Sequence, residues 1–405
     1  MICHVDADSF FASVLVRKNP RLRGKPLLAL GMGGTCVIAA TYEAKAFGVK
    51  TGMNLKDALK LVPHALQLSS DFRETAIASH EIEEILSREG PLLEQMSVDE
   101  WFLDLSGLPG GEPQDLRAWA TALQKKILTM TALSVSIGVG ATKLLAKMAG
   151  EYKKPAGITV VCRDVPPGRL YTSIESMLRD RPAAAIPGIG RRRDMQAQAR
   201  GWKTAWDFAQ ADQATVQKLF GKGGHELQRE LVGTIVSPVT TEKEPPKSIS
   251  RARSFLRTQD VSHLWAQTLR HLEYTVLKMR RQDLACSHVT VWLRQWDYGM
   301  VGDNRKLPSP MDTEEQLRPY IRDLFESLHQ EKVLYSQTGI ALFGLQPRGA
   351  PQYSLFQNPE NHEREEKIQQ TLDALHERYG RNVLTRGAAM EVSSQTKPQL
   401  PLSIL

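Results

Sequence analysis

Two apolar segments that each carry a pair of acidic residues constrain the fold of this chain more than any other feature. The N-terminal segment ICHVDAD and the later segment SVDEWFLDLSG both have the length and composition of buried strands. The first contains Asp6 and Asp8, and the second contains Asp99 and Glu100. A carboxylate is costly to bury alone, so a bound cation would explain both pairs, and oxygen ligands favour Mg²⁺ or Mn²⁺ over zinc. Solvated strand ends are the alternative interpretation.

Strand and helix patterns alternate over the first 162 residues. The segments ETAIASHEIEEILSRE and LRAWATALQKKILTM have helical periodicity, and LSVSIGVG has the character of an apolar strand. This alternation predicts a mixed α/β domain at 1–162, with an insertion between the first strand and the first of these helices.

The remaining sequence divides at changes of composition. Residues 163–233 have the pattern of a small helical domain, and the prolines, threonines and alternating charges that follow mark an exposed linker at 234–247. Between 248 and 346 the patterns follow the order β-α-β-β-α-β. A tail at 347–405 contains one amphipathic helix. Several domains are expected for 405 residues.

Charge and cysteine content narrow the class of protein. The net charge of +7 favours a polyanionic partner, although many basic proteins touch no nucleic acid. The four cysteines are far apart and form no CxxC pair, which argues against a zinc site or a disulfide framework. Neither a leader peptide nor a run of 18 apolar residues is present, so we expect a cytoplasmic location and no membrane partner.

Six motifs occur in an order and spacing that resemble the Y-family DNA polymerases. They are HVDADSFFASV, ATYEAKAFGV, SVDEWFLDLSG, SIGVGATKLLAKMA, KKPAGI and IPGIG. The longer segment GTCVIAATYEAKAFGVKTGM, with IGRRR and ISRARSF, resembles the UmuC branch, the catalytic subunit type of bacterial DNA polymerase V. The resemblance implies error-tolerant DNA synthesis past lesions, in DNA repair and SOS mutagenesis.

The same resemblance implies a right-handed, multidomain α/β polymerase. Its palm would be 1–162 with fingers inserted at about 17–75, its thumb the helical segment 163–233, and its little finger the β-α-β-β-α-β domain at 248–346. The substrates would be primer-template DNA and a dNTP.

The metal ligands implied by the resemblance are Asp6, Asp99, Glu100 and the backbone carbonyl of Ala7. They would hold two Mg²⁺ ions, with Mn²⁺ as a possible substitute. Neighbouring residues on a strand face opposite ways, so Asp99 and Glu100 reach one site only if the strand bends or ends there. On this reasoning Asp99 is the favoured bridging ligand.

Nucleotide contacts are implied at five positions. Phe11 matches the steric gate that excludes a ribose hydroxyl, with Phe10 beside it, whereas a core aromatic is the alternative for either ring. Tyr42, Lys45 and Lys154 match residues that contact the triphosphate, for which cations are needed. Solvated surface lysines are the alternative.

DNA contacts are expected in two segments. In IPGIGRRR, Gly188 and Gly190 permit a tight turn of helix-hairpin-helix type, and the next helix would present backbone N–H groups to a phosphate. Arg191 and Arg192 add charge there. Arginines in SISRARSFLR alternate on a strand, and one face of the last domain could follow a DNA backbone. The two assigned to DNA binding are Arg251 and Arg253.

Partner binding is implied for the tail. Two segments resemble sliding-clamp-binding peptides, and each places a glutamine before spaced apolar anchors. The anchoring residues are Gln352, Leu355 and Phe356 in the first segment and Gln399, Leu400 and Leu402 in the second. Packing of either segment on the helix between them is the alternative. The UmuC resemblance further implies a UmuD-like dimer and RecA as partners.

Two other functions compete with a polymerase. A catalytically weak, polymerase-like scaffold would recruit partners in a mutagenesis complex, but retention of all three carboxylates argues against it. A structure-specific nuclease or DNA-binding module could use the same metals and hairpin, but would not need KKPAGI or the steric gate.

Overall fold

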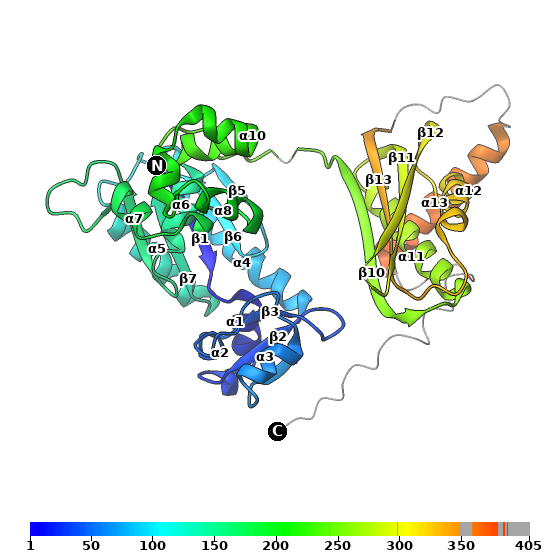
Figure 1. Ribbon diagram of the computed structural model, residues 1–405, viewed down its shortest axis with the longest axis horizontal. Coiled ribbons are helices and arrows are strands. Elements are labelled where there is room, and N and C mark those ends of the chain that lie inside the picture. Colours follow the sequence, from blue (N-terminus) through cyan, green and yellow to red (C-terminus); the bar gives the residue numbers. More distant parts are fainter. Residues whose placement is uncertain (243, 298, 349–358, 380–383, 385–386, 388–405) are drawn as a thin grey trace. The chain divides into compact units, whose positions relative to one another are not determined.

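The chain forms two compact units, Met1–Lys243 and Glu244–Leu405, and the boundary between them in the sequence falls within the predicted linker (Figure 1). The computed structural model describes residues 1–242, 244–297, 299–348, 359–379, 384 and 387. None of the described helices is both long and apolar enough to cross a membrane.

A mixed six-stranded sheet forms the centre of the first unit, as the alternating patterns predict. Its strand order is β5-β6-β1-β7-β8-β9. Strand β1 pairs antiparallel with both of its neighbours, whereas β7, β8 and β9 run parallel to one another. The strands are β1 (Ile2–Ala7), β5 (Leu93–Gln95), β6 (Glu100–Asp104), β7 (Val135–Gly140), β8 (Ile158–Cys162) and β9 (Thr172–Ser173). Every residue of β1 is buried, because the strand lies in the middle of the sheet.

Helices α4 (Phe72–Glu89) and α5 (Leu116–Thr131) cover one face of this sheet and share a core with Val5, Trp101 and Ile137. Helix α6 (Lys143–Gly150) packs on the opposite face. Its close approach depends on Gly138, where a Cβ would lie 2.1 Å from the Ala146 carbonyl oxygen. Since side chains alternate along a strand, His4 and Asp6 of β1 point to the α6 face.

A smaller sheet, of order β3-β2-β4, occupies the predicted insertion. Strands β2 (Leu27–Leu30), β3 (Val37–Ala40) and β4 (Leu66–Ser69) pack with α1 (Phe10–Lys18), α2 (Tyr42–Lys45) and α3 (Leu55–Leu61) around small cores of their own. Short 3₁₀ turns lie at Pro20–Leu22 and Leu105–Gly107. This part of the first unit contains Phe11, Tyr42 and Lys45.

Five helical elements follow β9 and surround a separate core that contains Phe208 and Phe220. They are α7 (Ile174–Arg179), the 3₁₀ helix η3 (Ala183–Ala185), α8 (Arg191–Gln198), α9 (Ala205–Gln210) and α10 (Gln213–Leu231). The carboxylate of Glu230 in α10 accepts hydrogen bonds from the backbone N–H groups of Leu144 (3.1 Å) and Ser237 (2.8 Å). The helical part is therefore tied to α6.

Most described residues of the predicted linker at 234–247 are exposed, but part of its backbone is held by the first unit. Besides the contact of Ser237 with Glu230, Val239 packs against the sheet, and the Thr240 N–H donates to Glu94 (3.0 Å). The first half of the linker is therefore mostly exposed, while carboxylates of the first unit hold its backbone at Ser237 and Thr240.

The second unit has the predicted β-α-β-β-α-β order. Its elements are β10 (Ser248–Thr258), α11 (Val261–Arg280), β11 (Leu284–Gln295), β12 (Met300–Met311), α12 (Glu314–Leu328) and β13 (Tyr335–Pro347). The sheet is antiparallel with strand order β10-β13-β11-β12. Both helices pack on one of its faces, over a core that contains Ile249, Val291 and Ile340.

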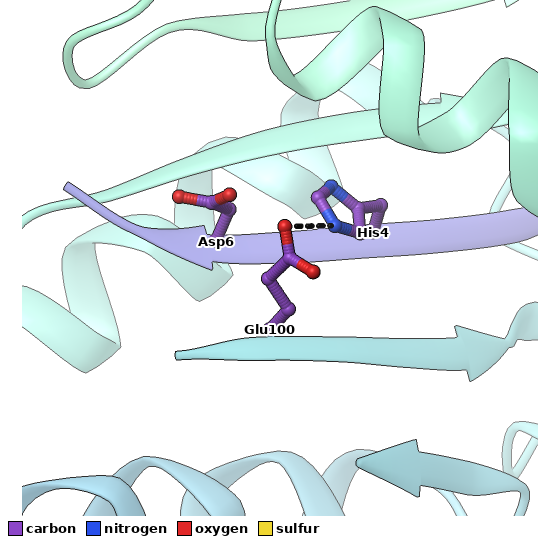
Figure 2. Close-up of side chains that lie close together, drawn as sticks. All are labelled: His4, Asp6 and Glu100. Atoms are coloured by element: carbon purple, nitrogen blue, oxygen red, sulfur yellow. Dashed lines mark ion pairs between the residues drawn. The ribbon is translucent and has the colours of Figure 1, made fainter. Parts of the chain in front are cut away.

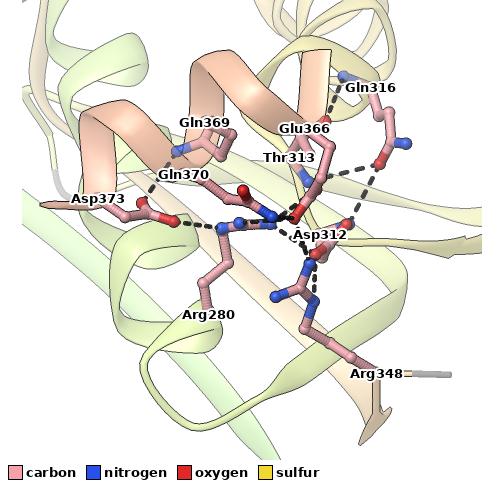
Figure 3. A network of polar contacts seen from close by, with 9 residues as sticks. All are labelled: Arg280, Asp312, Thr313, Gln316, Arg348, Glu366, Gln369, Gln370 and Asp373. Atoms are coloured by element: carbon pink, nitrogen blue, oxygen red, sulfur yellow. Dashed lines mark hydrogen bonds and ion pairs between the residues drawn. The ribbon is translucent and has the colours of Figure 1, made fainter. Parts of the chain in front are cut away.

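Helix α13 (Pro359–Tyr379) is joined to the second unit by charged side chains (Figure 3). Arg280 at the end of α11 is almost wholly buried and pairs with Asp373 (2.6 Å), Asp312 (2.7 Å) and Glu366 (3.1 Å). Arg348 pairs with Asp312 (2.6 Å) and Glu366 (2.7 Å). On the apolar side of the predicted amphipathic helix, Ile368 and Tyr379 are exposed, whereas Leu372 and Leu375 are half-buried. Ion pairs of Arg280 and Arg348 connect the helix to the second unit.

Candidate active site

Three potential metal ligands converge on the α6 face of the central sheet (Figure 2). Asp6 of β1 lies directly opposite Glu100 of β6 in the antiparallel register, so both side chains emerge on the same side. His4 precedes Asp6 by two residues and shares that face. One ligand atom from each of the three residues lies within 4.8 Å of the others.

Glu100, rather than the favoured Asp99, lies beside Asp6 in the structure. Strand β6 begins at Glu100, and alternation from this residue places Glu100, not Asp99, beside Asp6. The Asp99 carboxylate instead accepts a hydrogen bond from the Ser97 hydroxyl, and its backbone carbonyl accepts one from the N–H of Ala7 (2.9 Å). Within the described part of the chain, the converging group contains Asp6 and Glu100 and leaves out Asp99.

Two lysines neutralise the carboxylates of this group. The Lys154 ammonium lies 2.6 Å from Asp6 Oδ1, and the Lys147 ammonium of α6 pairs with Glu100 Oε1. The sequence predicted Lys154 as a triphosphate contact but missed Lys147, which reaches the site only because α6 packs across β1. Carboxylate oxygens are preferred ligands of divalent metal ions. Such an ion could take the place of the two ammonium groups beside these carboxylates.

Burial and charge separate the proton affinities of the three groups. Burial raises the pKa of the Asp6 carboxyl to about 7, although Lys154 acts in the opposite direction. Burial would also raise the pKa of Glu100, but the hydrogen bond and charge of Lys147 hold it below its ordinary value. Burial lowers the pKa of His4 to about 3, and Lys147 adds to this effect. At neutral pH His4 is therefore an uncharged imidazole, 3.9 Å from Glu100.

Asp8 has a structural role rather than membership of the metal cluster. Its buried carboxylate accepts hydrogen bonds from the hydroxyls of Ser134 (2.6 Å) and Ser136 (2.7 Å) and from the Ala156 backbone N–H (2.9 Å). The last of these fixes the KKPAGI loop against β1. Asp8 thereby positions Lys154 beside Asp6.

Tyr42 and Lys45 of α2 lie close to the same cluster. The Tyr42 hydroxyl donates to Asp8 (3.3 Å), and the Lys45 ammonium donates to the Ser9 hydroxyl (2.8 Å) and lies 4.5 Å from the Tyr42 ring centroid. Burial and the charge of Lys154 lower the pKa of Lys45. Two mutually repelling lysines next to a tyrosine hydroxyl form a site suited to an anion such as a triphosphate.

The two phenylalanines at the start of α1 differ in burial. Phe10 is fully buried in the main core of the first unit, which favours its alternative role as a core aromatic. Phe11 is only partly buried and packs edge-on against Phe72 (centroids 5.8 Å apart). Only Phe11 therefore retains a surface for a gate.

The predicted DNA contacts fall into two groups. Gly188 has a positive φ of 98°, and Gly190 caps α8 with Arg191 and Arg192 exposed in its first turn. The element before this turn is the 3₁₀ helix η3, not a full helix. The glycine turn and the exposed arginines are present, and their contact with DNA stays a prediction.

The arginines of β10 do not lie on the open face of their sheet. Arg251 and Arg253 follow Ile249 at a spacing of two and therefore share its face, which is buried under the helices at Ile249. The Arg251 guanidinium lies 4.2 Å from the Tyr274 ring of α11. The pleat turns both arginines to the helical side of the sheet, where Arg253 is exposed, and their contact with DNA stays a prediction. All six anchoring residues predicted for the sliding clamp lie outside the described residues.

Comparisons with known proteins agree along most of the chain. Residues 5–151 match the model of the impB/mucB/samB family, and residues 246–355 match that of its C-terminal domain. A DNA polymerase IV of Methanoculleus marisnigri is 33% identical over 78% of this chain and 87% of its own length. Another, of Streptomyces coelicolor, is 30% identical over 87% of this chain and 71% of its own length.

Solved structures share the fold. A Y-family DNA polymerase chimera of Dbh and Dpo4 superposes with a TM-score of 0.72 at 24% identity, over 85% of this chain and 99% of the chimera. An insertion ternary complex of Dbh DNA polymerase gives 0.58 at 23% identity, over 85% and 99%. The predicted fold class is confirmed. The narrower UmuC assignment is not supported, because these relatives are named DNA polymerase IV.

Proposed function

Since the chain belongs to the impB/mucB/samB family of Y-family DNA polymerases, we propose that it is a DNA-directed DNA polymerase that extends primers past template lesions. The observation that carries the proposal is the convergence of Asp6, Glu100 and Lys154 beside the anion site formed by Tyr42 and Lys45. A cation site next to an anion site is what transfer of a nucleotide from a triphosphate requires.

Divalent metal ions belong to this proposal. Asp6 and Glu100 would hold them, with His4 as a neutral neighbour and the Ala7 carbonyl at the end of β1 as a further oxygen. When bound, the ions would activate the primer 3′-hydroxyl and offset the charge of the triphosphate. The presence of two ions and their identity as Mg²⁺ are parts of the proposal, supported by the hard oxygen donors.

The chain's own residues would divide the remaining tasks. Lys45 and Lys154 would bind phosphate oxygens, and the Tyr42 hydroxyl would orient the triphosphate. Lys154 pairs with Asp6 in the structure, so it would exchange this partner for a phosphate. Phe11 would lie against the sugar and exclude a ribose hydroxyl. Asp8 would keep the Lys154 loop in place.

DNA would be gripped through its backbone. Exposed Arg191 and Arg192, together with the free N–H groups of α8, support a phosphate contact at the PGIG turn. A role in SOS mutagenesis, a cytoplasmic location and a sliding clamp bound through Gln352–Phe356 or Gln399–Leu402 also belong to the proposal, and these rest on the sequence alone. A UmuD-like dimer and RecA lose their support with the UmuC branch, so we propose extension without them.

The experiment is primer extension by the purified chain on a template whose next base is varied, with Mg²⁺ and each dNTP in turn. The proposal predicts that the added nucleotide follows the template base, and that extension continues past an abasic site. A scaffold would bind the primer-template without adding a nucleotide. A nuclease would shorten it.

A further inference from the structure

One buried side chain of the candidate active site has no task in the proposed reaction. It is His4 of β1, whose imidazole is fully shielded from solvent. Among the residues that the structure describes, none forms a hydrogen bond with either of its ring nitrogens. Native structures leave few buried polar atoms unpaired, so a histidine with two such atoms calls for an explanation. The groups that the ring faces indicate its role.

Two neighbours fix the orientation of the His4 ring. Gly150 of α6 lies against its Nδ1 edge, where a Cβ would be 2.8 Å from Nδ1. Phe102, the direct partner of His4 on β6, has its ring centroid 4.8 Å from that of the imidazole. The Nε2 atom is directed toward the Glu100 carboxylate, with Oε1 at 3.9 Å (Figure 2). The glycine thus leaves room for a ring whose other polar edge faces Glu100.

Lys147 occupies the oxygen that His4 faces. Its ammonium pairs with Glu100 Oε1, the same atom that lies 3.9 Å from His4 Nε2. An N–H···O hydrogen bond requires about 3.2 Å or less, so the gap exceeds this limit by roughly 0.7 Å. Lys147 would leave Glu100 when a divalent cation is bound there, since like charges repel. A small rotation of the Glu100 side chain then brings Oε1 within reach of His4.

A histidine can hold this carboxylate without becoming a metal ligand. The hard ions proposed for the site prefer oxygen ligands, which Asp6 and Glu100 supply. A carboxylate that binds a metal ion is itself hydrogen-bonded by a neighbouring group, and loss of such a group weakens the binding of the ion. Imidazole has an N–H donor even when it carries no charge, so it can donate next to cations without repelling them.

We propose that His4 positions Glu100 for metal binding by donating its Nε2–H to Glu100 Oε1. The hydrogen bond fixes the carboxylate so that it faces Asp6 across the β1–β6 pair. His4 is thus a positioning residue, which touches neither the ion nor the nucleotide. The inference deepens the proposed function and rests on its metal site.

The test measures the affinity for Mn²⁺ alone, by electron paramagnetic resonance, in the parent and in three variants of His4. His4→Phe keeps a flat ring but removes the donor, and it should weaken Mn²⁺ binding about 10- to 100-fold. The amide nitrogen of glutamine reaches the position of a histidine Nε2, whereas that of asparagine reaches only the position of Nδ1. His4→Gln should therefore restore the parental affinity, and His4→Asn should not.

A second readout separates positioning from a general loss of structure. In primer extension, His4→Phe should need about tenfold more Mg²⁺ for the half-maximal rate, and excess Mg²⁺ should recover most of the parental rate. A variant that is only misfolded would have a lower rate at every Mg²⁺ concentration, which would contradict the inference. If His4→Phe melts at a lower temperature than the parent, His4→Leu replaces it with the same expected loss of affinity.

His271→Phe is the matched control, because His271 is also a buried histidine with unpaired ring nitrogens but lies in the second unit. It should leave the affinity for Mn²⁺ unchanged. Unchanged affinity in His4→Phe would overturn the inference alone. Equal losses in His4→Gln and His4→Phe would overturn it too, because the ring would then be a ligand itself. A parent that binds no Mn²⁺ would overturn the proposed metal site together with this inference.

Discussion

Glu100 and Asp99 are neighbours in sequence, but their side chains have different environments. Glu100 faces Asp6 across the β1–β6 pair, whereas Asp99 is held by Ser97. We therefore expect Glu100→Gln to reduce the rate of nucleotide addition at least as strongly as Asp99→Asn, by about 10²-fold or more if it removes a metal ligand. Single-turnover incorporation measures both. A severe loss in Asp99→Asn with a mild one in Glu100→Gln would restore the assignment made from sequence.

The raised pKa of Asp6 predicts a pH dependence of metal binding. With a pKa of about 7, the carboxyl is largely protonated at pH 6, and a divalent ion must displace that proton. Metal affinity should rise by up to about tenfold per pH unit below pH 7 and level off above it. Titration with Mn²⁺ at pH 6, 7 and 8 gives this curve, and Asp6→Asn should flatten it.

The same raised pKa makes the stability of the chain without metal fall as the pH rises, whereas metal affinity increases. A carboxyl whose folded pKa is raised from about 4 to about 7 stabilises the fold below pH 4, and that contribution is lost as the pH rises through 7. Metal-free parent chain should therefore lose stability over this window relative to Asp6→Asn. For the metal-binding prediction, equal metal affinity of the parent at pH 6 and pH 8 would contradict the raised pKa of Asp6.

Substitution of Phe11 tests whether its ring excludes a ribose hydroxyl from the proposed nucleotide site. Its partly exposed ring contacts Phe72 edge-on, and trimming it would open space beside a nucleotide sugar. Phe11→Ala should raise the ratio of rNTP to dNTP incorporation by about tenfold or more, because a clash is removed. Phe10→Leu is the control, since Phe10 lies in the core and should affect stability without changing this ratio. An unchanged ratio in Phe11→Ala would show that the gate lies elsewhere.

Several site residues followed from sequence, and others needed the fold. Asp6, Tyr42, Lys45 and Lys154 were identified from motifs, and the structure gathers all four in one place. His4 could have been found too, since a period of two puts it on the face of Asp6. Lys147 could not, because its approach to Glu100 depends on how α6 crosses the sheet. The order of Asp99 and Glu100 depended on the first residue of β6, a boundary that sequence patterns locate poorly.

At the scale of elements, the second unit was the more predictable part. Strong periodicity marked β10, α11, β11, α12 and β13, and all have the expected type and order. Strand β12 was less evident, because it lies at the sheet edge and only Leu307 and Met311 in it are buried apolar residues. No sequence pattern indicated that the backbone of the first half of the linker is held, because the acceptors Glu230 and Glu94 are distant in sequence.

Helix α13 depends on the Arg280 network, which predicts a response to charge. Arg280→Ala would leave Asp312, Glu366 and Asp373 without their shared cation and should destabilise the docked helix by about 1–3 kcal/mol. Hydrogen exchange of α13 amides, compared with those of α12, measures this loss. Arg322→Ala is the control, because its pair with Glu326 is exposed, and it should leave α13 unchanged.

Acid should release the same helix. Although burial acts the other way, hydrogen bonds from Arg280 and Arg348 lower the pKa of Glu366 to about 2. A depressed carboxyl pKa stabilises the fold above the ordinary value of 4.5, and this contribution is lost as the pH falls through 2. Exchange of α13 should therefore be unchanged at pH 5 and speed up between pH 4.5 and 2. Equal protection at pH 5 and pH 3 would show that the ion pairs do not hold the helix.

At the scale of the whole molecule, DNA binding and nucleotide transfer should be separable. The chain carries a net charge of +7. Its proposed phosphate contacts at Arg191 and Arg192 lie in the helical part of the first unit, whereas the carboxylates of the site lie on the central sheet. Because phosphate contacts dominate DNA affinity, loss of a carboxylate should leave binding intact. This separation distinguishes a polymerase from a scaffold that only holds DNA.

The central claim is that Asp6 and Glu100 form the metal site of a templated polymerase. The measurement that tests it most directly is single-nucleotide incorporation with Mg²⁺ by the parent chain, by Asp6→Asn and by Asp104→Asn, each at saturating primer-template. Asp104 lies at the other end of β6, and its carboxylate accepts hydrogen bonds from the N–H and hydroxyl of nearby Ser106, so it is the matched control. We predict addition of the complementary nucleotide by the parent and Asp104→Asn, and loss of about 10³-fold or more in Asp6→Asn with DNA affinity unchanged. Near-parental incorporation by Asp6→Asn would contradict the account.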